Sequence, residues 1–124
     1  MLIVEDNPDL LEMTTDLLTE LGCDVTTAVD GPSGLARLSS ERFAIALIDI
    51  GLPGLDGYEL VRRARALVDG QVRLVAMSGY GQAEDRERAL AAGCDLHLTK
   101  PVGVADLRRV LAETAELSSR AARL

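Results

Sequence analysis

Short apolar runs alternate along the chain with longer segments whose apolar residues recur at helical spacing. The apolar runs cover residues 1–4, 23–29, 43–49, 72–78 and 95–99. The helical patterns that follow them cover about 8–21, 31–40, 57–68, 82–93 and 104–118. Strands that alternate with helices in this way are typical of a parallel sheet with helices packed on both faces. The pattern therefore predicts five strand–helix units.

The apolarity of the strands also predicts their order. Runs 1–4, 43–49 and 72–78 are nearly continuous, as expected for strands that are covered on both faces. Runs 23–29 and 95–99 include Thr, Asp or His, which is typical of edge strands. With those two runs outside, short right-handed connections favour the order 2-1-3-4-5. We expect an α/β fold: a flavodoxin-like (βα)5 three-layer sandwich.

Two of the predicted helices begin with a capping residue. Asn7 stands directly ahead of Pro8, and this pair is typical of a helix N-cap followed by the first helical position. Asp56 stands in the same way ahead of Gly57. Gly22 and Gly93 are placed to end the first and fourth helices. These residues predict the helix boundaries more closely than periodicity does.

Composition narrows the class of protein. A chain of 124 residues, 48% of them hydrophobic, fits one globular domain over residues 1–124. The 20 acidic residues outnumber the 13 basic ones, which argues against nucleic-acid binding. The apolar runs are too short to span a bilayer, and the start of the chain lacks the pattern of a secretory signal. We expect a cytoplasmic protein that does not engage the membrane.

The two cysteines, Cys23 and Cys94, lack the spacing of metal ligands. Both stand where short strands are predicted to begin, so we interpret them as small buried residues. A disulfide between them is the alternative, and its absence would fit a reducing compartment.

Polar residues stand at the ends of four predicted strands. Glu5 and Asp6 follow the first, Asp49 ends the third, Ser78 ends the fourth and Lys100 follows the fifth. In a parallel sheet these ends share one edge, where open α/β sheets bind ligands. Three carboxylates in one place favour a hard divalent cation such as Mg²⁺, whereas a hydroxyl and a lysine suit an anion beside it. Together these groups indicate phosphoryl transfer onto an aspartate.

At this point the chain resembles a known family. The motifs "VEDN", "LIDIGLPGLDG", "AMSGY" and "TKP", each at a strand end, are similar over the full length to the receiver domain of two-component response regulators. The stretch "SGYGQAEDRERALAAGCDLHLTKPV" is most similar to receivers at the C-terminus of hybrid histidine kinases.

The resemblance implies a phosphoacceptor and a metal site. Asp49 would accept a phosphoryl group from a phosphohistidine. Asp6 and Asp49 would bind Mg²⁺ directly, with Mn²⁺ as the alternative ion. The backbone carbonyl of Gly51 would add a ligand, and Glu5 would act mainly through water.

The resemblance also implies residues that sense the phosphoryl group. Ser78 would hydrogen-bond one phosphoryl oxygen, and Lys100 would pair with another. The bond before Pro101 would be cis. His97 takes the place of a Phe or Tyr that moves inward on activation in the family, so it is either a switch residue together with Ser78 or an ordinary structural histidine.

The implied partner is a sensor histidine kinase or a histidine phosphotransfer protein, with a kinase core linked in the same protein as a further alternative. Two other functions of the same fold remain as hypotheses. An aspartyl-phosphate phosphatase typically carries a second aspartate where this chain has Gly51, and a receiver used only as a binding module has no need of the intact site. A mononucleotide binder is disfavoured because "EDNPDL" would repel phosphate.

Overall fold

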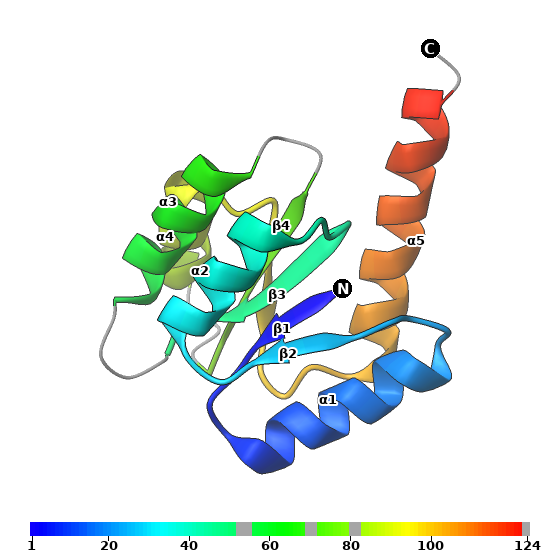
Figure 1. The fold of residues 1–124 in the computed structure, drawn as a ribbon, viewed down its shortest axis with the longest axis horizontal. Helices are drawn as coiled ribbons and strands as arrows, with labels where there is room; N and C mark the ends of the chain where they lie inside the picture. The colour runs from blue at the N-terminus through cyan, green and yellow to red at the C-terminus, as the bar shows by residue number, and fades with distance from the viewer. Residues whose placement is uncertain (52–55, 69–71, 80–82, 123–124) are drawn as a thin grey trace.

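The computed structural model describes residues 1–51, 56–68, 72–79 and 83–122, and in 83 and 116–122 it describes the backbone alone. Within these residues strands and helices alternate along the chain (Figure 1). The strands are β1 Leu2–Val4, β2 Thr26–Ala28, β3 Ile45–Asp49, β4 Arg73–Ser78 and β5 Leu96–Thr99. The helices are α1 Pro8–Glu20, α2 Gly31–Ser40, α3 Gly57–Leu67, α4 Ala83–Ala92 and α5 Val104–Ala122.

The strands form one parallel sheet in the order β2-β1-β3-β4-β5. This is the flavodoxin-like topology, and the two strands predicted as edges are the edges. Figure 1 shows helices α2, α3 and α4 on one face of the sheet and helices α1 and α5 on the other. The predicted fold class and strand order are therefore confirmed.

Each face of the sheet carries its own hydrophobic core. Ala46 and Ile48 of β3 face the core under α2, α3 and α4, whereas Ile45 and Leu47 face the core under α1 and α5. Successive strand residues point to opposite faces, so a strand covered on both sides must be apolar throughout. All five residues of β3 are buried, and Asp49 is its last residue.

The capping predictions agree with the structure. Asn7 Oδ1 accepts hydrogen bonds from the backbone N–H groups of Asp9 and Leu10 at 3.0 and 3.2 Å. Asp56 Oδ1 accepts from the N–H of Tyr58 at 2.9 Å. These bonds satisfy donors that a helix N-terminus otherwise leaves unpaired. They fix the points at which α1 and α3 leave the edge of the sheet that carries the polar residues.

Two elements, β2 and α5, have a boundary that differs from the prediction by more than two residues. β2 is limited to Thr26–Ala28 because its partner β1 is itself three residues long. The last helix continues to Ala122 instead of ending near 118, since the sequence "SSRAA" contains no glycine or proline to stop it. No helix in the described part of the chain has the length and apolarity needed to cross a membrane.

The cysteines are both free thiols, and they differ in environment. Cys94 is buried, as predicted, and burial raises the pKa of its thiol to about 12. Cys23 is only half-buried and lies in the connection between α1 and β2, so its interpretation as a buried strand residue is wrong. β2 begins only at Thr26, so Cys23 lies before the strand and packs against the core as a partly buried residue.

We expect Gly57→Ala to destabilise the domain strongly. Gly57 opens α3, and a Cβ at this position would overlap the backbone carbonyl oxygen of Ile50, the residue that follows Asp49. Backbone atoms cannot rotate away as a side chain can, so the chain itself must shift. We expect the free energy of unfolding, measured by urea denaturation, to fall by about 3 kcal/mol.

Gly79→Ala is the matched control for this prediction. A Cβ at Gly79 would have no described heavy atom within 4 Å, and its φ lies outside the left-handed region. Its unfolding midpoint should stay close to that of the wild type. Equal midpoints for both variants would contradict the close approach of Gly57 to Ile50.

Candidate functional site

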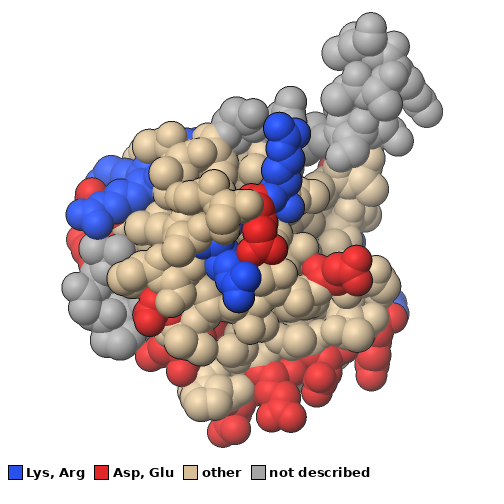
Figure 2. Space-filling view, viewed as in Figure 1, with Lys and Arg blue, Asp and Glu red and all other residues tan. Residues whose placement is uncertain are grey.

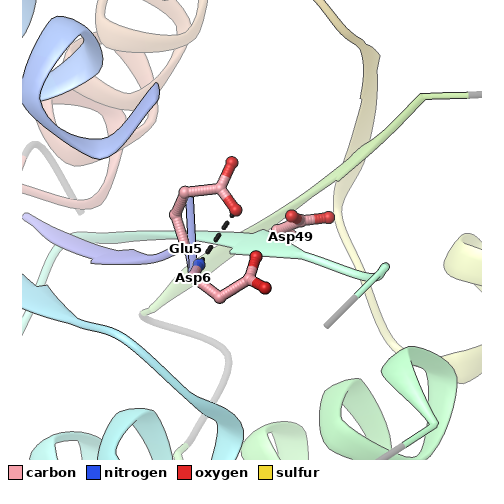
Figure 3. Close-up of side chains that lie close together, drawn as sticks. All are labelled: Glu5, Asp6 and Asp49. Carbon is pink, nitrogen blue, oxygen red and sulfur yellow. Dashed lines mark hydrogen bonds between the residues drawn. The ribbon is translucent and has the colours of Figure 1, made fainter. Parts of the chain in front are cut away.

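The polar residues at the strand ends converge at one edge of the sheet, as the sequence predicted. Glu5 and Asp6 directly follow β1, and Asp49 is the last residue of the neighbouring strand β3. Figure 3 shows the side chains of Glu5, Asp6 and Asp49 close together at this edge. Ser78 ends β4 on the other side of Asp49, and Lys100 follows β5. The order of the strands thus brings together residues that are far apart in the sequence.

Lys100 bridges two of the carboxylates. Its Nζ lies 2.7 Å from Asp49 Oδ2 and 3.0 Å from Glu5 Oε1. The side chains of Glu5 and Asp49 are almost fully buried, whereas 22% of the Lys100 side chain is exposed. The ammonium group therefore partly neutralises two charges that would otherwise repel each other at the sheet edge. The peptide bond between Lys100 and Pro101 is cis.

Backbone groups complete the environment of the carboxylates. The N–H of Gly51 donates to Asp49 Oδ1 at 2.8 Å, so each oxygen of the Asp49 carboxylate has a donor. The N–H of Asp6 donates to Glu5 Oε2 at 3.0 Å. The role of the Gly51 carbonyl as a metal ligand stays a prediction, since the contact found at Gly51 is made by its N–H.

The environment shifts the pKa values of Glu5 and Asp49 in opposite directions. Burial raises the pKa of Glu5 to about 7; its contact with Asp49 adds to this shift and Lys100 opposes it. Burial also acts to raise the pKa of Asp49, but hydrogen bonds with Glu5, Lys100 and Gly51 outweigh it and hold that pKa below its usual value. The pKa of Lys100 is raised because its bonds to both carboxylates outweigh the effect of burial. At neutral pH Asp49 is therefore the ionised acid that a nucleophile requires.

The three acids fit a divalent cation. Glu5, Asp6 and Asp49 each offer a carboxylate oxygen, and these oxygens lie within 4.8 Å of one another. Asp6 is exposed, so the cluster is open to solvent on that side. Oxygen ligands, net negative charge and room for water are the properties of Mg²⁺ sites in proteins. The residues present therefore suit a hydrated Mg²⁺ ion.

Ser78 and His97 are in direct contact. The Oγ atom of Ser78, which is buried, lies 2.7 Å from Nε2 of His97. His97 pairs across the sheet with Ala76, two residues before Ser78, so both side chains lie on the same face. The pKa of His97 is lowered by burial; the charge of Asp85 opposes this and that of Arg86 adds to it. Sequence analysis named both residues but not their contact.

A second group of contacts beside the site had no counterpart in the sequence analysis. The hydroxyl of Tyr58, in the first turn of α3, donates to Asp85 Oδ1 in α4 at 3.0 Å. The guanidinium carbon of Arg88 lies 4.0 Å from the centroid of the Tyr58 ring, a cation–π contact. These residues connect the helix that follows Asp49 to the helix that follows Ser78. Their spacing along the chain gives no sign of this, because Tyr58 lies in α3 and both of its partners lie in α4.

The fold and the acidic, lysine-bridged edge define a class, a flavodoxin-like α/β domain with a carboxylate at its topological switch point. The model of the response regulator receiver domain family matches residues 1–112. The chain therefore belongs to the response regulator receiver domain family. Domains of this family generally act as signalling domains and not as enzymes.

The similar proteins include a sensor histidine kinase and two solved receiver domains. The chain is 36% identical over 116 residues to the sensor histidine kinase RcsC of Salmonella typhi; this covers 94% of the chain but 12% of RcsC. A receiver domain protein of Methanospirillum hungatei is 33% identical, with a TM-score of 0.87 and coverage of 96% of this chain and 95% of that one.

The receiver domain of the sensor histidine kinase PA1611 of Pseudomonas aeruginosa is 36% identical, with a TM-score of 0.81 and coverage of 90% and 93%. In that structure a magnesium ion is coordinated in the active-site cleft. The chain is thus homologous to receiver domains of sensor kinases, and it spans only a small part of the length of RcsC.

Proposed function

We propose that residues 1–124 form a single cytoplasmic receiver domain that acts as a phosphorylation-dependent signalling switch, with Asp49 as the phosphoacceptor. The observation that carries the proposal is the state of Asp49. Its carboxylate is buried, held ionised, and contacted at one oxygen by Lys100 and at the other by the N–H of Gly51. A charged nucleophile at the switch point of the sheet, beside two further acids, is suited to accept a phosphoryl group.

In the proposed reaction an oxygen of Asp49 forms a bond to phosphorus, and the bond between phosphorus and the donor's imidazole nitrogen breaks. The donor is a phosphohistidine on a sensor kinase or a histidine phosphotransfer protein, or on a kinase core of the same protein. Lys100, 2.7 Å from Asp49 Oδ2, moves from pairing with carboxylates to pairing with a phosphoryl oxygen.

Mg²⁺, or Mn²⁺ in its place, would be held by Asp6, Asp49 and the carbonyl of Gly51, with Glu5 acting through water, and it would supply neutralisation of the phosphoryl charge. The PA1611 receiver domain, with its coordinated magnesium ion, supports this assignment.

The new charge is then sensed by Ser78, whose hydroxyl hydrogen-bonds a phosphoryl oxygen. Ser78 contacts His97 of β5, so its movement is passed to that strand. The surface formed by α4, β5 and α5 changes as a result, and a partner or a linked domain recognises the change. In this scheme the domain promotes its own phosphorylation and slow dephosphorylation, and its role is signalling.

The test is an intact-mass measurement of the tag-free domain after incubation with Mg²⁺ and acetyl phosphate. We expect an adduct of about 80 Da, the mass of one phosphoryl group, and we expect no adduct to form when EDTA is present from the start in place of free Mg²⁺. A domain that serves only as a binding module would give no adduct, and that result would refute the proposal. A dedicated phosphatase would instead release phosphate from aspartyl-phosphate proteins over many turnovers.

A further inference from the structure

The contact between Ser78 and His97 joins the hydroxyl that would sense the phosphoryl group to an imidazole, a side chain that can gain or lose a proton. The 2.7 Å separation of Ser78 Oγ and His97 Nε2 is a short hydrogen bond, and Ser78 is buried. Lys100, which would bind the phosphoryl group, is tied to the same place, because its backbone N–H donates to the carbonyl oxygen of Ser78 at 2.7 Å. His97 is thus one hydrogen bond away from the group that would sense phosphorylation.

This hydrogen bond can run in either of two directions. When Nε2 of His97 carries no proton, the hydroxyl of Ser78 donates to it. The hydroxyl proton is then not directed at the phosphoryl group that Asp49 would carry. When His97 is protonated, both ring nitrogens are donors, so Nε2 must donate to Ser78 Oγ. Ser78 Oγ then accepts from the ring and no longer donates its proton to it, as a hydrogen bond from Ser78 to a phosphoryl oxygen requires. A neutral His97 with its proton on Nε2 donates in the same way, so the neutral ring allows both directions of the bond, whereas the protonated ring allows only the one in which Nε2 donates. Protonation of His97 therefore removes the direction in which Ser78 donates its proton to the ring.

Burial and the neighbouring charges act on His97 in different senses. In the described residues, the charges that act on its imidazole are those of Asp85, which favours protonation, and Arg86, which opposes it, both at the start of α4. Burial beside Ser78 disfavours the imidazolium in the unphosphorylated domain. A phosphoryl dianion bound by Ser78 would place negative charge near His97, separated from it only by the Ser78 hydroxyl. This charge would favour the imidazolium.

We propose that protonation of His97 favours the phosphorylated state of the domain, so that the switch responds to pH as well as to its phosphodonor. The inference rests on the proposed function of Asp49 and Ser78. His97 is a positioning residue, since it acts through the hydroxyl of Ser78. By linkage, the effect is reciprocal: phosphorylation must tighten the binding of the proton by the same factor by which the proton tightens phosphorylation.

The sign follows from the two states. The phosphorylated domain holds the His97 proton more tightly, so a fall in pH favours it and a rise in pH removes that advantage. The advantage at low pH is complete below the His97 pKa of the unphosphorylated domain, which is lowered from the ordinary histidine value of 6.5. The advantage is lost once the pH rises above the His97 pKa of the phosphorylated domain.

One test uses the wild-type protein alone. His97 is the only histidine in the chain, so the imidazole C–H resonances of the tag-free domain report on it without assignment. The titration is recorded with Mg²⁺ alone and with Mg²⁺ and beryllium trifluoride, a stable mimic of the aspartyl phosphoryl group. We expect the midpoint to move to higher pH in the presence of the mimic. An unchanged or lower midpoint overturns the inference.

A second test uses His97→Gln, which can donate to or accept from Ser78 but does not titrate. The affinity for beryllium trifluoride is measured at pH 6.0 and pH 8.0 for wild type and variant. The ratio between the two proteins cancels the pH dependence of the ligand and of the acidic cluster. On going from pH 8.0 to pH 6.0, we expect the affinity of the wild type for beryllium trifluoride to rise about fivefold relative to that of His97→Gln. His97→Phe, which keeps a ring but no hydrogen bond, should show the same pH profile as His97→Gln.

The outcomes separate this inference from the function on which it rests. If the wild type forms the phosphoryl adduct but its pH profile matches that of His97→Gln, the role of His97 is wrong and the phosphoacceptor role of Asp49 stands. If the wild type forms no adduct and does not bind beryllium trifluoride, the proposed function fails and the inference fails with it.

Discussion

Asp49→Asn is expected to abolish the phosphoryl adduct that wild type forms with acetyl phosphate and Mg²⁺. The amide has nearly the shape of the carboxylate and can still accept the Gly51 N–H, but it has no negative charge with which to attack phosphorus. It also removes one of the two charges that hold Lys100 in place. We expect the rate of adduct formation, followed by intact mass, to fall at least about a thousandfold.

Asp56→Asn is the matched control. Asp56 belongs to the same motif, but its Oδ1 accepts the N–H of Tyr58 as the N-cap of α3. Asparagine caps helices about as well as aspartate, so this variant should fold and form the adduct at a rate near that of wild type. An adduct on Asp49→Asn, or its loss in Asp56→Asn alone, would mean that the phosphoacceptor has been wrongly assigned.

Lys100→Met should have the second-largest effect, and it should act on both chemistry and stability. The methionine keeps much of the volume of the side chain but removes the cation that lies 2.7 Å from Asp49 and 3.0 Å from Glu5. Without it, the charge of the phosphoryl oxygens loses a partner, and we expect adduct formation to slow by about a hundredfold. The two buried carboxylates are left unpaired, which should lower the free energy of unfolding at pH 8 by about 3 kcal/mol.

The stability loss in Lys100→Met should depend on pH. With the cation removed, the carboxylate pair keeps a proton more tightly in the folded state than in the unfolded one. Stability should therefore be retained at low pH and lost as the pH rises through the pKa of the folded pair. Urea denaturation at pH 5 and pH 8 measures this difference. Arg62→Met, which removes an exposed cation from α3, should show neither effect. Equal stability of Lys100→Met and wild type at pH 8 would contradict the bridging role.

Much of the fold could be predicted because it depends on local patterns. The alternation of apolar runs and helical periodicities predicted the elements, and Asn7 and Asp56 predicted where α1 and α3 begin. The polar residues in the runs of β2 and β5 were sufficient to place these strands at the edges. Where a boundary depended on a partner, as in β2 beside the short β1, the local pattern predicted too long a strand.

The meeting of Glu5, Asp6 and Asp49 could also be predicted from the sequence, because parallel strands end at one edge and the order of strands places β1 next to β3. The pairing of the residues could not. Lys100 contacts Glu5 across 95 residues of sequence and Asp49 across 51. Its choice of both acids depends on the depth and direction of each side chain, which no local pattern encodes.

The sequence by itself thus determined the sheet, its order, and the set of chemical groups at its edge, because each of these follows from the period and the ends of individual elements. Only the tertiary structure decided which groups bond to one another: Lys100 to two acids, Tyr58 to Asp85, and His97 to Ser78. These contacts join different elements, and their distances are set by how the helices and strands pack. The contact of His97 with Ser78, which connects titration to the proposed switch, belongs to this second kind.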